Sequence, residues 1–286
     1  MSEDTQPPKS PPGAGRPRVA PAVLESLPEL ARFARSVADT ARRTSLRYFR
    51  AGPELLIKAD GSPVTIADRE TERVIRELLR RSYPQHAVIG EEHGWTPSDQ
   101  PYTWVVDPID GTKSYLAGAP TYGTLLALLY DGAPLLGIID IPALDERWCG
   151  VVGQPTTMND RPAKTRACTA LEQALLTIIS PDKLESGERP AVDALSRMAR
   201  VRRYSSDGYS HALLASGYVD MVVAVGQQPF DYLAVVPVVE GAGGCISDWA
   251  GKPLGLDSDG RILVTATREL HRQALNVLRA EQDASA

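Results

Sequence analysis

Two aspartates, Asp107 and Asp110, stand three positions apart in the order Asp-Pro-Ile-Asp-Gly-Thr, at the end of a short apolar, β-branched run. The run predicts a buried strand that delivers both carboxylates to its C-terminal edge before the chain turns into a helix. Pro108 fixes its own φ and has no amide proton, so the bend that brings the carboxylates together is stiff. Carboxylate oxygens in such a cluster are ligands for a divalent cation such as Mg²⁺.

The residues that follow favour an anion beside that metal. Gly111 lets the backbone approach a ligand closely, and the amides of Gly111 and Thr112 open a predicted helix, where anions bind. This combination predicts a divalent metal that holds a phosphate group. A purely structural interpretation is also open, in which Asp110 caps the helix after an Asx-turn.

Two further aspartates stand at predicted helix starts. Asp68 lies in the first turn of a helix predicted after Thr65, where the helix dipole alone would favour a carboxylate. Asp231 is predicted to open a helix that runs toward Gly241, and by itself it would be interpreted as a helix cap. Neither residue indicates chemistry without the wider pattern.

That wider pattern resembles the inositol monophosphatase superfamily of magnesium-dependent phosphatases, from about residue 30 to residue 280. Three motifs of the family occur here in the family's order, and they are Gly90-Glu91-Glu92, Asp107-Pro108-Ile109-Asp110-Gly111-Thr112 and Phe230-Asp231-Tyr232-Leu233-Ala234. Three other stretches look most like the bacterial histidinol-phosphate phosphatase branch, and they are Lys113-Ser114-Tyr115, Tyr122-Gly123-Thr124 and residues 238–244.

The resemblance implies a set of metal ligands. Glu91, Asp107 and the carbonyl oxygen of Ile109 would hold one Mg²⁺, and Asp107, Asp110 and Asp231 would hold a second. A third, weaker site near Glu91 is common in the family, and Mn²⁺ is an alternative metal. Crowded carboxylates repel one another and resist joint ionisation without cations.

The resemblance also implies how water would be activated. The Thr112 hydroxyl, hydrogen-bonded to Asp68, would orient the attacking water, and Glu91 would take part in catalysis through its metal. Glu92 is expected to be solvated. No covalent intermediate is needed, because two metals about 3.5–4 Å apart can activate a water and stabilise the leaving oxygen.

The expected substrate is a small phosphate monoester, with histidinol phosphate preferred. Gly111, Thr112, Lys58 and Asp207 are the predicted substrate-binding residues, and Asp207 is expected to pair with the α-ammonium of histidinol. The alternative for Asp207 is an exposed loop residue that caps a helix. Many family members have a substrate-contacting glutamate where this chain has Ala224, so inositol 1-phosphate and other small sugar or nucleotide esters stay open.

The first half of the chain, residues 21–152, is predicted to place helices against an antiparallel sheet. Apolar residues recur every three or four positions between about residues 22 and 50, which predicts an amphipathic helix with Pro28 in or just before its first turn. Asp131-Gly132 lies between two apolar runs and predicts a hairpin.

Strands alternate with helices in residues 153–286, which predicts an α/β half that contributes Asp231 and the substrate pocket. With the resemblance, the expected architecture is a layered αβαβα sugar-phosphatase-type fold with an N-terminal α+β half and a C-terminal α/β half. Residues 1–20 are proline-rich without large apolar side chains, and they are predicted to be a disordered tail.

The composition excludes several other classes of protein. A net charge of -5 leaves no electrostatic footprint for nucleic acid or an anionic membrane, and no apolar run approaches the length of a membrane span. Three cysteines without C-x-x-C spacing are expected to be reduced in a cytoplasm. A homodimer is expected from the resemblance. The remaining alternative is a non-catalytic phosphate-binding subunit, against which the intact set of acidic residues argues.

Overall fold

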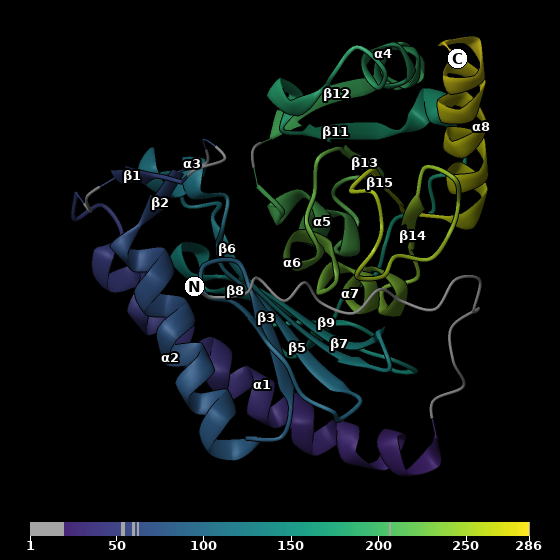
Figure 1. The fold of residues 1–286 in the computed structure, drawn as a ribbon. Coiled ribbons are helices and arrows are strands. Elements are labelled where there is room, and N and C mark those ends of the chain that lie inside the picture. The colour runs from purple at the N-terminus through teal and green to yellow at the C-terminus, as the bar shows by residue number, and fades with distance from the viewer. Residues whose placement is uncertain (1–19, 53–54, 59–60, 62, 206, 286) are drawn as a thin grey trace.

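The computed structural model describes residues 20–52, 55–58, 61, 63–205 and 207–285, and it arranges them in alternating layers of helices and sheets (Figure 1). The predicted tail lies outside the described residues apart from Ala20. One sheet has eight strands, a second has five, and a small antiparallel pair consists of β1 (Leu55–Ile57) and β2 (Pro63–Thr65).

The eight-stranded sheet positions most of the residues singled out above. Its strands are β3 (Ala87–Gly90), β4 (Gly94–Thr96), β5 (Tyr102–Asp110), β6 (Gly123–Tyr130), β7 (Ala133–Ile141), β8 (Glu146–Val151), β9 (Thr157–Met158) and β10 (Arg161–Pro162). They lie in the order β10-β9-β8-β7-β6-β5-β3-β4. The sheet therefore continues past residue 153, the predicted start of the second half.

The predicted hairpin at Asp131-Gly132 is confirmed, since it joins β6 and β7 as an antiparallel pair. The prediction of a purely antiparallel sheet is wrong, because β3 and β5 run parallel. The reason is that β4 folds back along β3, so the chain returns to the starting end of β3 before β5 begins. Parallel strands end at the same edge of a sheet, and this places Glu91 beside the end of β5.

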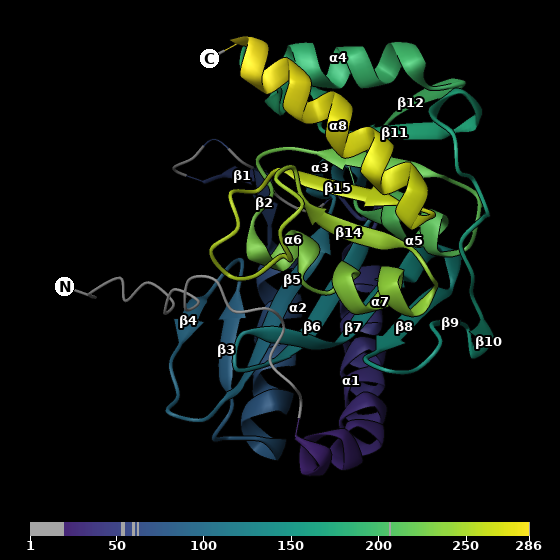
Figure 2. The ribbon, with the colours of Figure 1, turned by 90° about the vertical axis from the view of Figure 1, so that its right-hand side faces the viewer.

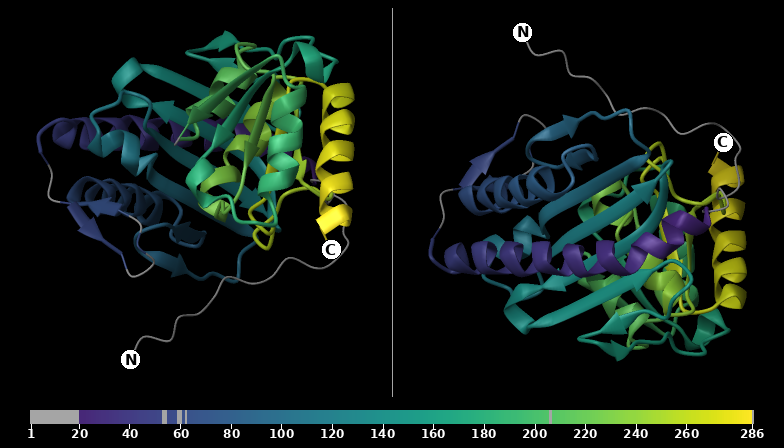
Figure 3. Two further views of the ribbon diagram at one scale, coloured as in Figure 1. Left: turned by 90° about the horizontal axis from the view of Figure 1, so that it is seen from above. Right: turned by 90° about the horizontal axis from the view of Figure 1, so that it is seen from below.

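Two long helices cover one face of this sheet, α1 (Pro21–Tyr48) and α2 (Ile66–Ser82), as the view from below in Figure 3 shows for α1. Helix α1 is confirmed, but Pro28 lies inside it and not near its start. Pro21 occupies the first turn instead, where a missing amide proton has no cost. Leu27, Leu30 and Val37 are buried against the sheet, which stabilises the helix through the proline.

Helices α5 (Tyr209–Ala215), α6 (Pro229–Tyr232) and α7 (Val235–Gly241) lie between the two sheets and share a core with both. The second sheet has the order β12-β11-β13-β15-β14, and its strands are β11 (Leu175–Ile179), β12 (Val201–Ser205), β13 (Met221–Ala224), β14 (Cys245–Asp248) and β15 (Ile262–Thr265). Helices α4 (Arg189–Met198) and α8 (Arg268–Ser285) cover its outer face (Figure 2). The layers run α, β, α, β, α, as expected.

Strands β5 and β6 cross the middle of the first sheet and are apolar on both faces. Val105 and Leu125 pack toward the helices between the sheets, whereas Trp104 and Leu126 pack toward α1 and α2. A strand buried on both sides is held firmly, so the residues at its end are fixed in position. Across the described residues, no helix is long and apolar enough to cross a membrane.

Candidate active site

The end of β5 is bent by a bulge that carries the two motif aspartates. Asp107 pairs with Leu125 and Asp110 with Gly123, so β5 has one residue more than β6 over this stretch. Pro108 lies in the bulge, where its missing amide proton removes no regular ladder bond. The Thr124 hydroxyl donates to the Pro108 carbonyl oxygen at 2.8 Å. The sequence thus builds a rigid bend at the edge of a buried strand.

Asp107, Asp110 and Asp231 meet at this bend, with one carboxylate oxygen from each within 4.8 Å of the others. Burial raises the pKa of Asp107 and of Asp110 well above the usual value, and neighbouring carboxylates add to the effect. Burial likewise raises the pKa of Asp231 to about 6. Oδ1 of Asp107 is buried and has no hydrogen-bond partner among the described residues. These features fit a bound divalent cation, which would supply the missing partner and offset the repulsion.

Backbone amides hold two of these carboxylates in place. The Gly208 amide donates to Asp110 at 2.6 Å, and the Gln228 amide donates to Asp231 at 2.6 Å. Asp231 is the third residue of the short helix α6, so the prediction that it opens a helix reaching Gly241 is wrong. The two helices are separated at Leu233 and Ala234, and Pro237 has no amide to donate to the Leu233 carbonyl, which removes one of the hydrogen bonds that would join them.

Glu91 lies beside the trio and also lines the cavity described below. Its backbone amide donates to the Val106 carbonyl at 3.2 Å, which extends the parallel pairing of β3 and β5. Lys58 contacts the carboxylates of both Glu91 and Glu92, at 2.9 and 2.5 Å. The structure therefore places Lys58, predicted to bind substrate, in an ion pair with the two glutamates.

The expectation that Glu92 is solvated is wrong. Its side chain is only 4% exposed, because it lies under the Lys58 ammonium group. Burial raises the pKa of Glu92 to about 7, even though its contact with Lys58 opposes the shift.

Thr112 and Asp68 come together from different elements. Thr112 begins α3 (Thr112–Leu116), directly after Gly111 at φ +78°, and its hydroxyl lies 3.5 Å from Asp68 Oδ1. The other oxygen of Asp68 accepts from the amide and the hydroxyl of Thr65, the residue that caps α2. Asp68 is fully buried, and burial raises its pKa. The capping box between Thr65 and Asp68 thus holds Oδ2 and leaves Oδ1 facing Thr112.

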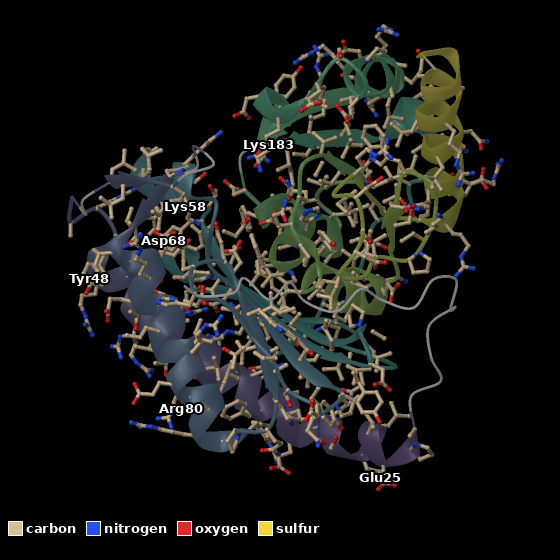
Figure 4. All side chains as sticks on the ribbon, in the orientation of Figure 1. Glu25, Tyr48, Lys58, Asp68, Arg80 and Lys183 are labelled. Atoms are coloured by element: carbon tan, nitrogen blue, oxygen red, sulfur yellow. The ribbon has the colours of Figure 1, made fainter. Side chains whose placement is uncertain are left out.

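A cavity of about 400 Å³ opens over these residues. The four acidic side chains, Gly111, Thr112 and Ile109 form one part of its lining. Gly61, Pro63 and Lys113 of the first half extend this part, and the second half contributes in particular Ser180, Lys183, Gln227 and Gln228. Figure 4 shows Lys58 and Asp68 on the first half and Lys183 on the part of the second half that faces them.

The second half was predicted to contribute to the pocket, but Ser180, Lys183, Gln227 and Gln228 were not among the predicted site residues. Lys183 belongs to a short 3-10 segment, Pro181–Lys183, that follows the parallel strand β11. The Ser180-Pro181 break directly after an apolar run is the signal that was present, because ligands bind beyond the carboxyl ends of parallel strands. Lys113, also in the lining, forms an ion pair with Asp182 across the rim.

Asp207 requires a correction. Among the described residues it does not line the cavity, and it is only 5% exposed. Its carboxylate accepts hydrogen bonds from the hydroxyls of Ser114 and Thr121, both at 2.7 Å, and from that of Ser205 at 3.2 Å. A buried carboxylate was expected to need a cation, but three hydroxyl donors satisfy it here. Its Cβ also occupies the space beside Gly111, where an added Cβ would come within 2.6 Å.

Ala224, at the position where the resemblance to the inositol monophosphatase superfamily leads one to expect a glutamate, is 1% exposed at the end of β13. It packs in the core between the sheets and is not part of the cavity lining. Of the carboxylates in the part of the chain that the structure describes, the four that line the cavity are gathered at its acidic end, and they are Glu91, Asp107, Asp110 and Asp231.

The layered αβαβα fold, with a cluster of carboxylates at the end of a buried strand, matches the phosphoric monoester hydrolases of the sugar-phosphatase type. The chain belongs to the inositol monophosphatase family, whose sequence profile matches residues 26–283. It is 42% identical to the chloroplastic bifunctional phosphatase IMPL2 of Arabidopsis thaliana, over 87% of this chain and 76% of the relative. It is 36% identical to the histidinol-phosphatase of Chlorobaculum parvum, over 85% and 94%. Among solved structures, an inositol monophosphatase from Zymomonas mobilis superposes with a TM-score of 0.82 at 38% identity, covering 89% of this chain and 99% of that one.

Proposed function

We propose that the protein hydrolyses histidinol phosphate, in a reaction that depends on two or three Mg²⁺ ions, with Mn²⁺ as an alternative. The observation that carries the metal dependence is the trio of the buried Asp107 and the half-buried Asp110 and Asp231, whose carboxylates repel one another and have oxygens within 4.8 Å. Glu91 and the Ile109 carbonyl would complete the ligand set at the same end of the cavity. Bound divalent cations would supply an activated water and stabilise the leaving oxygen.

The chain's own residues would orient the reactants. The Thr112 hydroxyl would hold the attacking water. Asp68 Oδ1 would accept a hydrogen bond from this hydroxyl and so fix the orientation of the hydroxyl group. Gly111 has no side chain and would let the phosphate group approach the backbone. The alcohol part of the substrate would extend toward Ser180 and Gln227 on the second half.

The names of the relatives support histidinol phosphate as the substrate, because both sequence relatives described above are phosphatases and one is a histidinol-phosphatase. Inositol 1-phosphate is the second candidate, supported by the structural likeness to an inositol monophosphatase. The loss of Asp207 as a partner for an ammonium group removes one argument for histidinol phosphate. The preference therefore rests on the relatives.

A phosphate-release screen tests the proposal. Purified protein with Mg²⁺ would be given histidinol phosphate, inositol 1-phosphate, fructose 1,6-bisphosphate and adenosine 3′,5′-bisphosphate, and the Asp107→Asn variant would serve as the inactive control. We expect histidinol phosphate to have the highest kcat/KM. A higher kcat/KM for another ester would overturn the choice of substrate, and no release from any ester would overturn the hydrolase activity itself.

We also propose that the protein is a cytoplasmic homodimer. The family resemblance supports the dimer, and the three cysteines, all without disulfides in the structure, support a reducing compartment. Light scattering after size-exclusion chromatography would report the mass directly, and a single protomer mass at assay concentration would exclude the dimer.

A further inference from the structure

Helix α2 buries polar side chains where an amphipathic helix normally buries apolar ones. Asp68 and Glu72 lie one turn apart on its inner face, and both are fully buried. Glutamate is almost never fully buried unless it is paired. The Asp68 carboxylate faces Thr112. The Glu72 carboxylate has a different set of partners.

The Glu72 carboxylate holds the turn that follows β3. It accepts from the backbone amide of Glu92 at 2.6 Å and from that of His93 at 3.1 Å. Arg76, one turn further along α2, neutralises it through Nε at 2.6 Å and contacts the same turn through the Gly94 carbonyl. Charge-assisted bonds to backbone amides are short and directional, so the turn is fixed relative to the helix.

Gly90, at the end of β3, leaves the space that the Glu72 carboxylate occupies. A Cβ atom at this position would lie 2.1 Å from Glu72 Oε1, so any side chain would displace the carboxylate. Its φ is not among the positive values, which means that the glycine is required by space and not by backbone conformation. Gly90 and Glu92 flank Glu91 in the sequence, and both are in contact with Glu72.

We propose that Glu72 is a positioning residue, which sets the Glu91 carboxylate for the metal that the proposed function requires. Through Asp68 and Glu72, one rigid helix fixes both the Thr112 hydroxyl and the Glu91 turn, so the spacing between them is built into α2. Outer residues that orient ligands contribute about 10- to 100-fold to metal affinity. The competing explanation is that Glu72 only stabilises the fold.

Glu72→Gln tests this, with Gly90→Ala as an independent disruption of the same contact. Glu77→Gln is the matched control, because Glu77 lies on the same helix, is 39% exposed and pairs only with arginines of α2 among its described ion pairs. For each protein, Mn²⁺ binding without substrate would be measured by electron paramagnetic resonance, thermal unfolding by calorimetry, and the Mg²⁺ concentration for half-maximal phosphate release by titration.

We expect Glu72→Gln and Gly90→Ala each to weaken metal binding by about 10- to 100-fold, with kcat restored toward the wild-type value at saturating metal. The double variant should be no weaker than the worse single variant, because both act on one contact. Glu77→Gln should bind as the wild type does. A lower unfolding temperature with unchanged Mn²⁺ affinity in both variants would overturn the proposal, and so would a wild-type protein that binds no Mn²⁺. Mn²⁺ binding without phosphate release from any ester would contradict the proposed function alone, since Glu72 is tested by binding.

Discussion

Thr112→Ala separates a catalytic hydroxyl from a structural one. The hydroxyl of Thr112 lies 3.5 Å from Asp68 and 3.3 Å from the Ile109 carbonyl, both at the long end of the hydrogen-bond range. A neutral hydrogen bond contributes about 0.5–1.5 kcal/mol to stability and one to a charged group about 1.5–3 kcal/mol, and contacts this long belong at the low end of these ranges. Removing the hydroxyl should therefore change the unfolding temperature little. Positioned proton acceptors and donors contribute about 10²–10⁴-fold to rate, so kcat should fall by about that factor.

The assay is steady-state phosphate release at saturating Mg²⁺, combined with a Mg²⁺ titration and a thermal melt of each variant. Thr112→Ser keeps the hydroxyl and should retain much of the activity, whereas Thr112→Val keeps the shape and should be as slow as Thr112→Ala. Metal affinity should be nearly unchanged in all three, because the side chain of Thr112 is not among the ligands. If Thr112→Val is the best tolerated change, the residue only packs the start of α3, and the catalytic role is refuted.

Three further predictions concern buried titratable side chains. Asp107→Asn should lower turnover at least about 10²-fold. In EDTA it should raise the unfolding temperature, because the substitution removes the charge of one of the repelling carboxylates. A higher unfolding temperature for the wild type than for Asp107→Asn in EDTA would contradict this. Asp207→Asn should slow histidinol phosphate and inositol 1-phosphate by the same factor and lower stability, because its partners are Ser114 and Thr121 and not the substrate; a selective loss of one substrate would show that Asp207 contacts it. Burial lowers the pKa of His211 to about 4 in the folded protein, whereas its pKa in the unfolded chain is near 6.5. The neutral His211 therefore makes its full contribution to stability above pH 6.5, and this contribution is lost as the pH falls toward 4. The free energy of unfolding should drop by about 1.5 kcal/mol more in the wild type than in His211→Asn between pH 6.5 and pH 5, and equal slopes would show that His211 is not buried neutral.

The stretch from Asp107 to Thr112 was predictable because its information is local. Pro108 and Gly111 constrain the backbone wherever the strand lies, and the apolar run before them indicates burial in any fold. The layered architecture followed from the resemblance, and most strands and helices followed from hydrophobic periodicity. The position of Pro28 inside α1 could not be predicted from local rules, because burial along the whole of α1 outweighs the local cost of one proline.

The roles of Asp207 and Glu92 were not predictable from the sequence, because their partners are distant along the chain. Thr121 reaches Asp207 across 86 positions, and Lys58 reaches Glu92 across 34. A carboxylate that is costly to bury has the same sequence signature whether a substrate cation, a lysine or a set of hydroxyls compensates it. Lys183 was missed for a similar reason: the Ser180-Pro181 break before it marks the end of a strand, but the residues that face it across the cavity are distant along the chain.

The most direct test of the central claim is phosphate release before and after removal of divalent metal. The trio of Asp107, Asp110 and Asp231 offers only oxygen ligands, which suit Mg²⁺ or Mn²⁺. We predict that turnover of histidinol phosphate is lost in EDTA and returns when excess Mg²⁺ is added. Undiminished turnover by the chelated protein would contradict the account of this site.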